Sequence, residues 1–231
     1  MMKTSAIIVA AGSGSRLGRG EPKAFVPLAG KALLSYSLAT IAHISAVNEV
    51  VIAVPAGMEA AARREASNLA VPVKITAGGA ERQDSVRMAL AITSALSEMV
   101  VVHDAARPLA TLELFEACLA AAERAGGAIA ATPVADTLKR VGDDRAIVAT
   151  VPRAGLWQAQ TPQAFLRTLL LAAHDRAQRE GIRATDDADL VERAGGKVEV
   201  VECATPNFKI TTASDLALAE ALLFGTSAAR R

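Results

Sequence analysis

The stretch Ala-Ile-Ile-Val-Ala-Ala-Gly-Ser-Gly-Ser-Arg-Leu-Gly at residues 6–18 decides the fold, because an apolar run leads directly into a glycine-rich loop. Residues 6–9 are continuously apolar, which is typical of a strand that is buried on both faces of a parallel sheet. Glycines that follow such a strand let backbone N–H groups approach an anion closely. The stretch therefore predicts an α/β protein whose first loop faces an anionic ligand.

Three classes of protein use a loop of this kind, and the residues of the loop separate them. A phosphate-binding loop of the GxxxxGK[ST] type is not found here. A dinucleotide fingerprint needs a third small residue where this chain has Leu17. Arg16 and Lys23 place two cations beside the glycines, and a triphosphate requires charge as well as amide groups. A simple turn is the alternative to a triphosphate-binding loop.

Apolar runs alternate with helical patterns through the first half of the chain. Strands are expected at residues 6–9, 49–54, 73–77, 99–102 and 128–131, and helices at residues 32–43, 58–69, 81–96 and 112–125. Buried strands separated by helices indicate a parallel sheet that is covered on both faces. The expected fold is a Rossmann-like three-layer α/β sandwich with a mostly parallel central sheet.

The second half of the chain departs from this alternation. Residues 137–141 and 146–151 are rich in β-branched residues and flank the polar tetrapeptide Gly142–Arg145, which predicts an antiparallel hairpin, an arm of about residues 136–152. A lone hairpin is marginally stable, so it is expected to pack on something, and a partner subunit is one candidate. Helices are expected at 163–179, 188–194 and 213–223, a strand at 197–201 and a frayed tail at 225–231. No linker divides the chain, so residues 1–231 are expected to form one domain.

Composition excludes several classes of protein. The chain has 231 residues with Lys+Arg 25 against Asp+Glu 24, a net charge of +1 and 52% hydrophobic residues. Balanced charge argues against a nucleic-acid-binding protein, and the apolar fraction argues against disorder. No apolar stretch is long enough for a membrane span or a secretory signal, and the two cysteines suggest no disulfide framework. A cytoplasmic protein is expected.

Asp104 ends a second apolar run, in Val-Val-His-Asp-Ala-Ala-Arg-Pro at residues 101–108. Ligands of open α/β sheets bind beyond the carboxyl ends of the strands. A carboxylate there suits Mg²⁺, which arrives with phosphate oxygens. A helix cap or an ion pair with Arg107 is the structural alternative, and His103 is interpreted as structural because no serine or cysteine partner is evident.

Two further segments carry candidate ligand-binding residues. Gly-Gly-Ala-Glu-Arg-Gln-Asp-Ser at residues 78–85 is a strand end, a glycine turn and a helix start, so Gly79 and Ser85 are candidates for reading a base. Lys209, in Asn-Phe-Lys-Ile-Thr at residues 207–211, is a candidate phosphate contact. An ordinary turn and a solvated lysine are the respective alternatives.

Taken together, these motifs resemble the 2-C-methyl-D-erythritol 4-phosphate cytidylyltransferase family over residues 6 to about 223. The resemblance is carried by AAGSGSRLG with the following PK, GGAERQDSV, VVHDAARP, LWQAQTPQAF, TDDA and NFKIT. It implies transfer of CMP from CTP to 2-C-methyl-D-erythritol 4-phosphate in non-mevalonate isoprenoid synthesis, with release of diphosphate. It also implies dependence on Mg²⁺ or another divalent cation, and a homodimer in which the hairpin arm embraces the partner.

The resemblance also implies roles for individual residues. CTP contacts carry over to Ala10, Ala11, Gly12, Gly14, Arg16, Lys23, Gly79 and Ser85. Acceptor contacts carry over to Asp104, Ala105, Arg107, Thr137, Arg153, Thr161, Thr185 and Lys209, with Asp104 also the metal carboxylate. Arg16, Lys23, Arg153 and Lys209 are the expected catalytic cations. Thr137 and Arg153 flank the arm, so their acceptor is expected in the partner's site, and Ala80 stands where family members often have an acidic residue.

Four rival functions remain at this stage. A ribitol 5-phosphate cytidylyltransferase would share the CTP half of the site, and a nucleotidyltransferase for another sugar phosphate or the molybdenum cofactor would share the first loop. A dinucleotide-dependent oxidoreductase is disfavoured by Leu17 and by Pro55 after the second strand. A non-catalytic nucleotide-binding regulator would not need cations around the α-phosphate.

Overall fold

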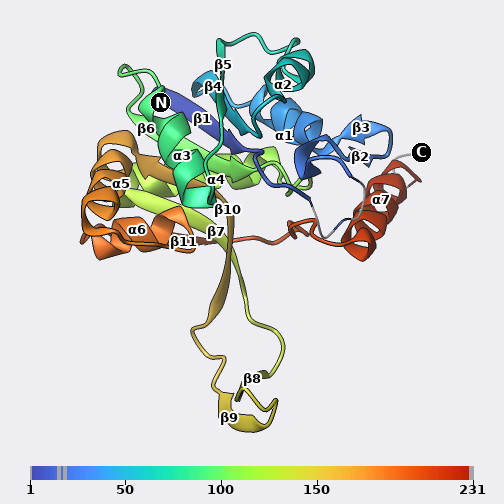
Figure 1. Ribbon diagram of the computed structural model, residues 1–231, viewed down its shortest axis with the longest axis vertical. Helices are drawn as coiled ribbons and strands as arrows, with labels where there is room; N and C mark the ends of the chain where they lie inside the picture. Colours follow the sequence, from blue (N-terminus) through green and yellow to red (C-terminus); the bar gives the residue numbers. More distant parts are fainter. Residues whose placement is uncertain (1, 15–16, 18–19, 229–231) are drawn as a thin grey trace.

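In the computed structural model, which describes residues 2–14, 17 and 20–228, a seven-stranded sheet runs through the centre of the molecule (Figure 1). Its strand order is β11-β7-β10-β6-β1-β4-β5. The strands span Thr4–Val9 (β1), Val47–Val54 (β4), Val73–Ala77 (β5), Met99–Asp104 (β6), Gly127–Pro133 (β7), Trp157–Leu166 (β10) and Glu199–Glu202 (β11). All neighbouring pairs are parallel except those of β10, which runs antiparallel to β6 and β7. The predicted mostly parallel sheet is confirmed.

Helices cover both faces of this sheet, and the three-layer sandwich is confirmed. One core joins the sheet to α1 (Leu33–Ile41), α2 (Glu59–Glu65) and α4 (Leu112–Ala125). A second core on the other face holds α3 (Arg82–Ala91), α5 (Arg167–Glu180) and α6 (Asp187–Arg193). Strands such as β6 are buried along their whole length, because a sheet covered on both faces exposes neither set of alternating side chains.

The C-terminal helix α7 (Ala213–Ala228) lies to one side of the sandwich, at the right of Figure 1. It contributes Leu216 and Ala219 to a third apolar cluster. The cluster also holds Leu28 from a small hairpin of β2 (Pro27–Leu28) and β3 (Lys31–Ala32), which follows the short 3₁₀ helix η2 (Lys23–Phe25). This cluster supports the segment on which Lys209 lies, since Ile210 belongs to it as well.

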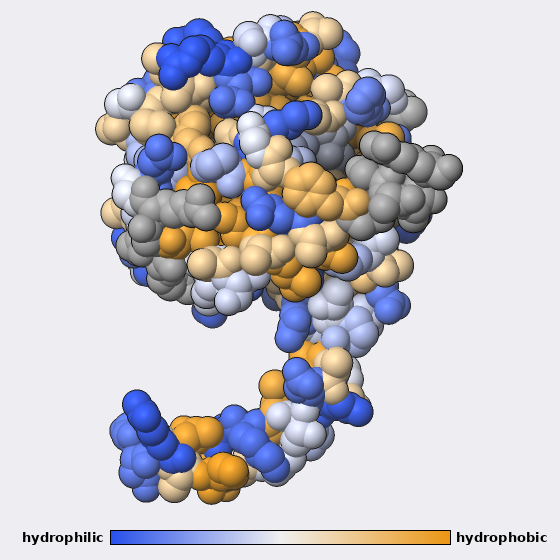
Figure 2. Space-filling view, turned by 90° about the vertical axis from the view of Figure 1, so that its right-hand side faces the viewer, coloured by the Kyte–Doolittle hydropathy of each residue, from blue (hydrophilic) through white to orange (hydrophobic). Residues whose placement is uncertain are grey.

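The predicted hairpin is present as β8 (Leu138–Val141) and β9 (Ile147–Val151), which pair antiparallel. It extends from the ends of β7 and β10 as an arm that leaves the body of the molecule (Figure 1). Apolar side chains gather near its end (Figure 2), where Val141, Ile147 and Val148 are 51%, 65% and 67% exposed. The arm therefore carries an apolar surface that its own body does not cover.

The largest error of the sequence prediction concerns β10. Residues 163–166 were expected to begin a helix at Gln163, but they are the end of a strand, and α5 starts only at Arg167. Gln163, Ala164, Phe165 and Leu166 are compatible with a helix by composition, yet each pairs with a residue of β6. Sheet pairing with β6, and with β7 as well for the first three, thus decides the conformation of residues that are compatible with either element.

Helix ends also differ from the predicted bounds. The helix expected to reach Leu96 ends at Ala91, because the Thr93 hydroxyl donates to the Leu90 carbonyl at 2.7 Å and the Ser94 amide donates to the Glu49 carboxylate. These side-chain bonds replace helical ones. At the C-terminus, residues 225–228 continue α7 rather than forming the start of a frayed tail. Within the described residues, no helix is both long and apolar enough to cross a membrane.

Candidate active site

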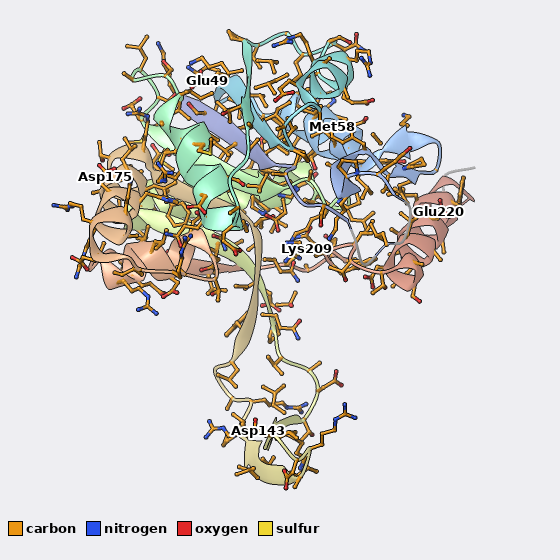
Figure 3. All side chains as sticks on the ribbon, viewed as in Figure 1. Glu49, Met58, Asp143, Asp175, Lys209 and Glu220 are labelled. Atoms are coloured by element: carbon orange, nitrogen blue, oxygen red, sulfur yellow. The ribbon has the colours of Figure 1, made fainter. Side chains whose placement is uncertain are left out.

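A cleft of about 480 Å³ lies beyond the carboxyl ends of β1 and β6. This is the edge at which open α/β sheets bind ligands. Five separate segments of the chain line it: Val9–Gly14, Lys23 with Ala24, Gly79–Arg82 with Ser85, Asp104–Ala106, and Lys209. In Figure 3, Lys209 lies in the body of the molecule, whereas Asp143 marks the far end of the arm.

The first glycine loop forms one wall of the cleft. The Lys23 amide donates to the Gly12 carbonyl at 3.1 Å, so the chain after the loop returns to it. Gly14 has a φ of 71°, and a Cβ atom there would lie 2.9 Å from the Lys23 nitrogen. Only glycine accommodates that conformation and that close approach. The predicted CTP contacts Ala10, Ala11, Gly12, Gly14 and Lys23 are thus brought together on the cleft, while Arg16 lies outside the described residues.

The second glycine turn forms the opposite wall. The Gly79 amide donates to the Ser85 hydroxyl at 3.1 Å, and this hydroxyl donates to the Glu81 carbonyl at 3.1 Å. A Cβ atom at Gly79 would lie 2.3 Å from the Cβ of Asp84, so the turn packs directly on the start of α3. Ser85 therefore shapes the turn, and its direct contact with a base stays a prediction.

The carboxylate of Asp104, at the end of β6, forms ion pairs with two cations at the cleft. Its Oδ1 accepts from Arg82 Nε at 3.0 Å and its Oδ2 accepts from Lys209 Nζ at 2.8 Å. Burial by itself raises the pKa of Asp104, but the charges of Arg82 and Lys209 outweigh burial and hold the pKa well below its usual range. The carboxylate is therefore ionised throughout the physiological range.

Thr161 lies behind Asp104, where its hydroxyl accepts from the Asp104 amide at 3.0 Å and bonds His103 Nδ1 at 3.1 Å. His103 Nε2 lies 3.2 Å from the Arg107 carbonyl. A carbonyl only accepts, so Nε2 carries the hydrogen and Nδ1 accepts from Thr161. Burial lowers the pKa of His103 to about 4, which keeps the ring neutral. The interpretation of His103 as structural is consistent with these bonds, and acceptor binding by the buried Thr161 stays a prediction.

Arg107 and Asn207 hold the segment that places Lys209. Arg107 Nη1 donates to the Asn207 carbonyl at 2.8 Å. Asn207 Nδ2 lies 2.9 Å from both Gln160 Oε1 and the Thr161 carbonyl. The Ile210 amide then donates to the Ala106 carbonyl at 2.8 Å. Lys209 is thereby fixed between two anchored neighbours, with its ammonium group facing Asp104.

The remaining predicted acceptor residues lie apart from this cleft. Thr137 and Arg153 are exposed at the root of the arm, where the Arg153 guanidinium bonds the Ala135 carbonyl. Thr185 is exposed just before α6. Ala105, by contrast, is buried and lines the cleft. Thr137 and Arg153 stay predictions for the cleft of a partner subunit.

Arg82 is the residue that the sequence analysis did not assign. It lines the cleft and bonds two carboxylates, Asp104 and Asp187. Its position carried a signal, because Arg82 is the first residue of α3 and a cation at a helix N-terminus is unfavourable. Such a cation requires compensating anions, and here they come from two distant parts of the chain.

Asp104 is a suitable protein ligand for a divalent cation in the cleft. Among the described residues, no group of three or more His, Cys, Asp or Glu side chains is arranged to hold a metal ion. Among the described residues, each oxygen of Asp104 has one cationic partner, and a carboxylate oxygen has two acceptor sites. Magnesium commonly binds through one or two carboxylates with phosphate oxygens and water, so Asp104 fits this role.

Comparison with known proteins supports these observations. The family model described as IspD, 2-C-methyl-D-erythritol 4-phosphate cytidylyltransferase, matches residues 4–224. A protein of that name from Deinococcus radiodurans is 49% identical over 95% of this chain and 89% of its own length. The crystal structure of the Thermus thermophilus protein of that name is 39% identical, with a TM-score of 0.80 over 96% of this chain and 98% of that one. The 4-diphosphocytidyl-2C-methyl-D-erythritol synthase structure from Anaerococcus prevotii is 30% identical, with a TM-score of 0.85 over 96% and 99%.

Proposed function

The chain belongs to the IspD family of 2-C-methyl-D-erythritol 4-phosphate cytidylyltransferases, and on that premise we propose that it transfers the cytidylyl group of CTP to 2-C-methyl-D-erythritol 4-phosphate. One observation carries the proposal for this chain. The two glycine turns, Lys23, Asp104 and Lys209 line a single cleft at the carboxyl edge of the sheet. Amide groups, two ammonium groups and one carboxylate are the groups that a metal-bound triphosphate requires.

The reaction is an in-line displacement at the α-phosphorus of CTP. A phosphate oxygen of the acceptor forms the new P–O bond, and the bond to the bridging oxygen of the β-phosphate breaks, so that diphosphate leaves. The attacking oxygen is already an anion at neutral pH, and no general base is needed. Catalysis then consists of positioning and of stabilising negative charge.

Different residues position the substrates and stabilise the negative charge. Amide groups of residues 10–14 bind the triphosphate, and Lys23 and Lys209 offset the charge that develops on the α-phosphate. Gly79 and Ser85 hold the wall against which the cytosine lies. Asp104 would hold a divalent cation, which when bound would supply charge to neutralise the phosphates. Arg16 is proposed as a further cation on the basis of the family resemblance.

We also propose that two copies of the chain associate as a homodimer through the arm. The arm exposes Val141, Ile147 and Val148, and exposed apolar surface of this kind favours association. In a second copy the arm would bring Thr137 and Arg153 to the partner's acceptor site. Sedimentation velocity tests this: replacing Ile147 and Val148 by aspartate is expected to convert dimers to monomers and to lower turnover. A wild-type chain that sediments as a monomer at assay concentration would refute the dimer.

The direct test of the activity is diphosphate release from CTP with Mg²⁺. Methylerythritol 4-phosphate and ribitol 5-phosphate are compared in parallel, with ATP and GTP as nucleotide controls. The expected result is that diphosphate is released only when methylerythritol 4-phosphate and CTP are combined, and not with the other acceptor or the other nucleotides. Release only with ribitol 5-phosphate would retain the CTP half of the proposal and overturn the acceptor, and release with neither would overturn the proposal.

A further inference from the structure

A continuous series of ionisable side chains runs from the cleft into the core beneath α3, α5 and α6. Lys209 bonds Asp104, Asp104 bonds Arg82, and Arg82 Nη1 bonds Asp187 Oδ2 at 2.7 Å. Asp187 Oδ1 in turn lies 3.2 Å from His174 Nε2. Both carboxylates are buried, with side chains 7% and 1% exposed. Within the part of the chain that the structure describes, Arg82 alone links the cleft end of this series to its core end.

Stability alone does not account for this series. Removing charges from water costs several kcal/mol for each ion, and a buried ion pair is often replaced by apolar residues at no loss of stability. A second consideration is geometry. Asp104 ends β6, Arg82 starts α3 and Asp187 starts α6, so one guanidinium joins two elements that line the cleft to a third that lies away from it.

Arg82 does not offer this guanidinium to a ligand. Nε and Nη1 each bond a carboxylate, and Nη2 is shielded from solvent with no hydrogen-bond partner among the described residues. Arg82 also lines the cleft, with its side chain 23% exposed, but its bonding nitrogens are directed at Asp104 and Asp187. The position points to action through Asp104.

We propose that Arg82, held by Asp187, is a positioning residue for the nucleotidyl transfer: it fixes the orientation of the Asp104 carboxylate and, through it, the ammonium group of Lys209. This inference deepens the proposed function and rests on it. The guanidinium is suited to the task because its planar fork fixes the angle between two acceptors, which a lysine ammonium group does not. The nucleoside side of the cleft has its own bonds, from Gly79 to Ser85 and from Glu81 to Asp84, so it is expected to survive the loss of Arg82.

The decisive variant is Arg82→Lys, which keeps the charge but loses the planar fork that fixes the two carboxylates relative to each other. Misplacement of reacting groups by about 1 Å costs on the order of 100-fold in rate, and a fall in kcat of that size is expected. CTP affinity, measured by calorimetry without acceptor, is expected to stay within about threefold of the wild-type value. The contacts that bind CTP equally well in the ground state and the transition state do not depend on Arg82. The same titration counts the sites that bind CTP, so kcat is expressed per competent site and loss of folded protein does not imitate the effect.

Asp187 supplies a second, conservative comparison. Asp187→Asn keeps an oxygen that accepts from Arg82 Nη1, whereas Asp187→Ala removes it. Positioning predicts that the asparagine variant stays within about fivefold of wild-type kcat and that the alanine variant falls about 30-fold or more. This pair decides the question if Arg82→Lys does not fold.

The matched control is Arg183→Gln. Arg183 is 67% exposed and bonds Asp84 at 3.2 Å, so it links the α3 region to the segment before α6 without touching Asp104. Its kcat is expected to stay within about twofold of wild type, as for other exposed ion pairs. If the wild-type enzyme is active and Arg82→Lys has the same kcat, the positioning role is overturned but the proposed function is not. The same holds if the two Asp187 variants have equal kcat. A wild-type enzyme that releases no diphosphate from CTP would overturn the proposed function, and this inference with it.

Discussion

Replacing Thr161 by valine removes one buried hydroxyl at nearly constant volume. In the wild-type protein this hydroxyl accepts from the Asp104 amide and donates to His103 Nδ1. His103 has no alternative tautomer, because the Arg107 carbonyl requires a hydrogen on Nε2. The substitution therefore leaves two polar groups unpaired, one on Asp104 and one on His103.

The expected cost follows from these two groups. A buried donor or acceptor left unpaired costs about 1–3 kcal/mol, and Thr161 and His103 are 4% and 0% exposed. We therefore expect Thr161→Val to lower the free energy of unfolding by about 3 kcal/mol. Thr161→Ser is the matched control, because it keeps the hydroxyl and loses one methyl group, worth about 1 kcal/mol.

Urea unfolding followed by circular dichroism measures the free energy of unfolding, and diphosphate release measures the KM for the acceptor. If the hydroxyl is structural, valine costs about 2 kcal/mol more than serine, and neither changes the acceptor KM greatly once folded protein is counted. A valine variant within about 1 kcal/mol of wild type would refute the hydrogen-bond assignment. A large rise in acceptor KM without loss of stability would instead support the direct acceptor contact predicted for Thr161.

Three further predictions concern other parts of the molecule. Lys209→Gln is expected to lower kcat about 10²–10³-fold, as for the loss of one donor to a developing oxyanion, and near-normal diphosphate release would contradict its role. Gly78→Ala places a Cβ atom 2.3 Å from the Cβ of Ala11, so calorimetry should show weaker CTP binding while the urea midpoint changes less. Glu49 on β4 accepts from Ser5 at 2.5 Å and pairs with Lys74 at 2.9 Å, and although burial raises its pKa, these partners lower it below the ordinary value. Because the pKa of Glu49 is lower in the folded state, its interactions stabilise the protein at pH values above the ordinary pKa of a glutamate, and this stability is lost as pH falls through the folded-state pKa. Glu49→Gln should therefore make the free energy of unfolding depend less on pH in the acid range, and an unchanged slope would contradict the assignment.

Local features of the sequence determined much of the fold and the ligand-binding loops. The buried strands β1, β4, β6 and β7 contain continuous apolar runs, and the arm follows from two β-branched segments around a polar turn. Gly14 and Gly79 were recognisable as candidate ligand-loop residues, because glycines that follow a strand let backbone amides approach an anion closely, with an ordinary turn as the alternative. Lys23, Asp104 and Lys209 were found as charged residues at strand and loop ends, and the structure places all three on one cleft.

Tertiary structure alone decided the identity of β10 and the connections of the site. Residues 163–166 have no strong local preference, and their strand exists because β6 and β7 offer hydrogen bonds on either side. Arg82 meets Asp187 across 105 positions of the chain, and Thr161 meets His103 across 58. Periodicity and turn chemistry act over a few residues, whereas these pairs depend on which strand and helix ends the folded sheet brings to the same edge.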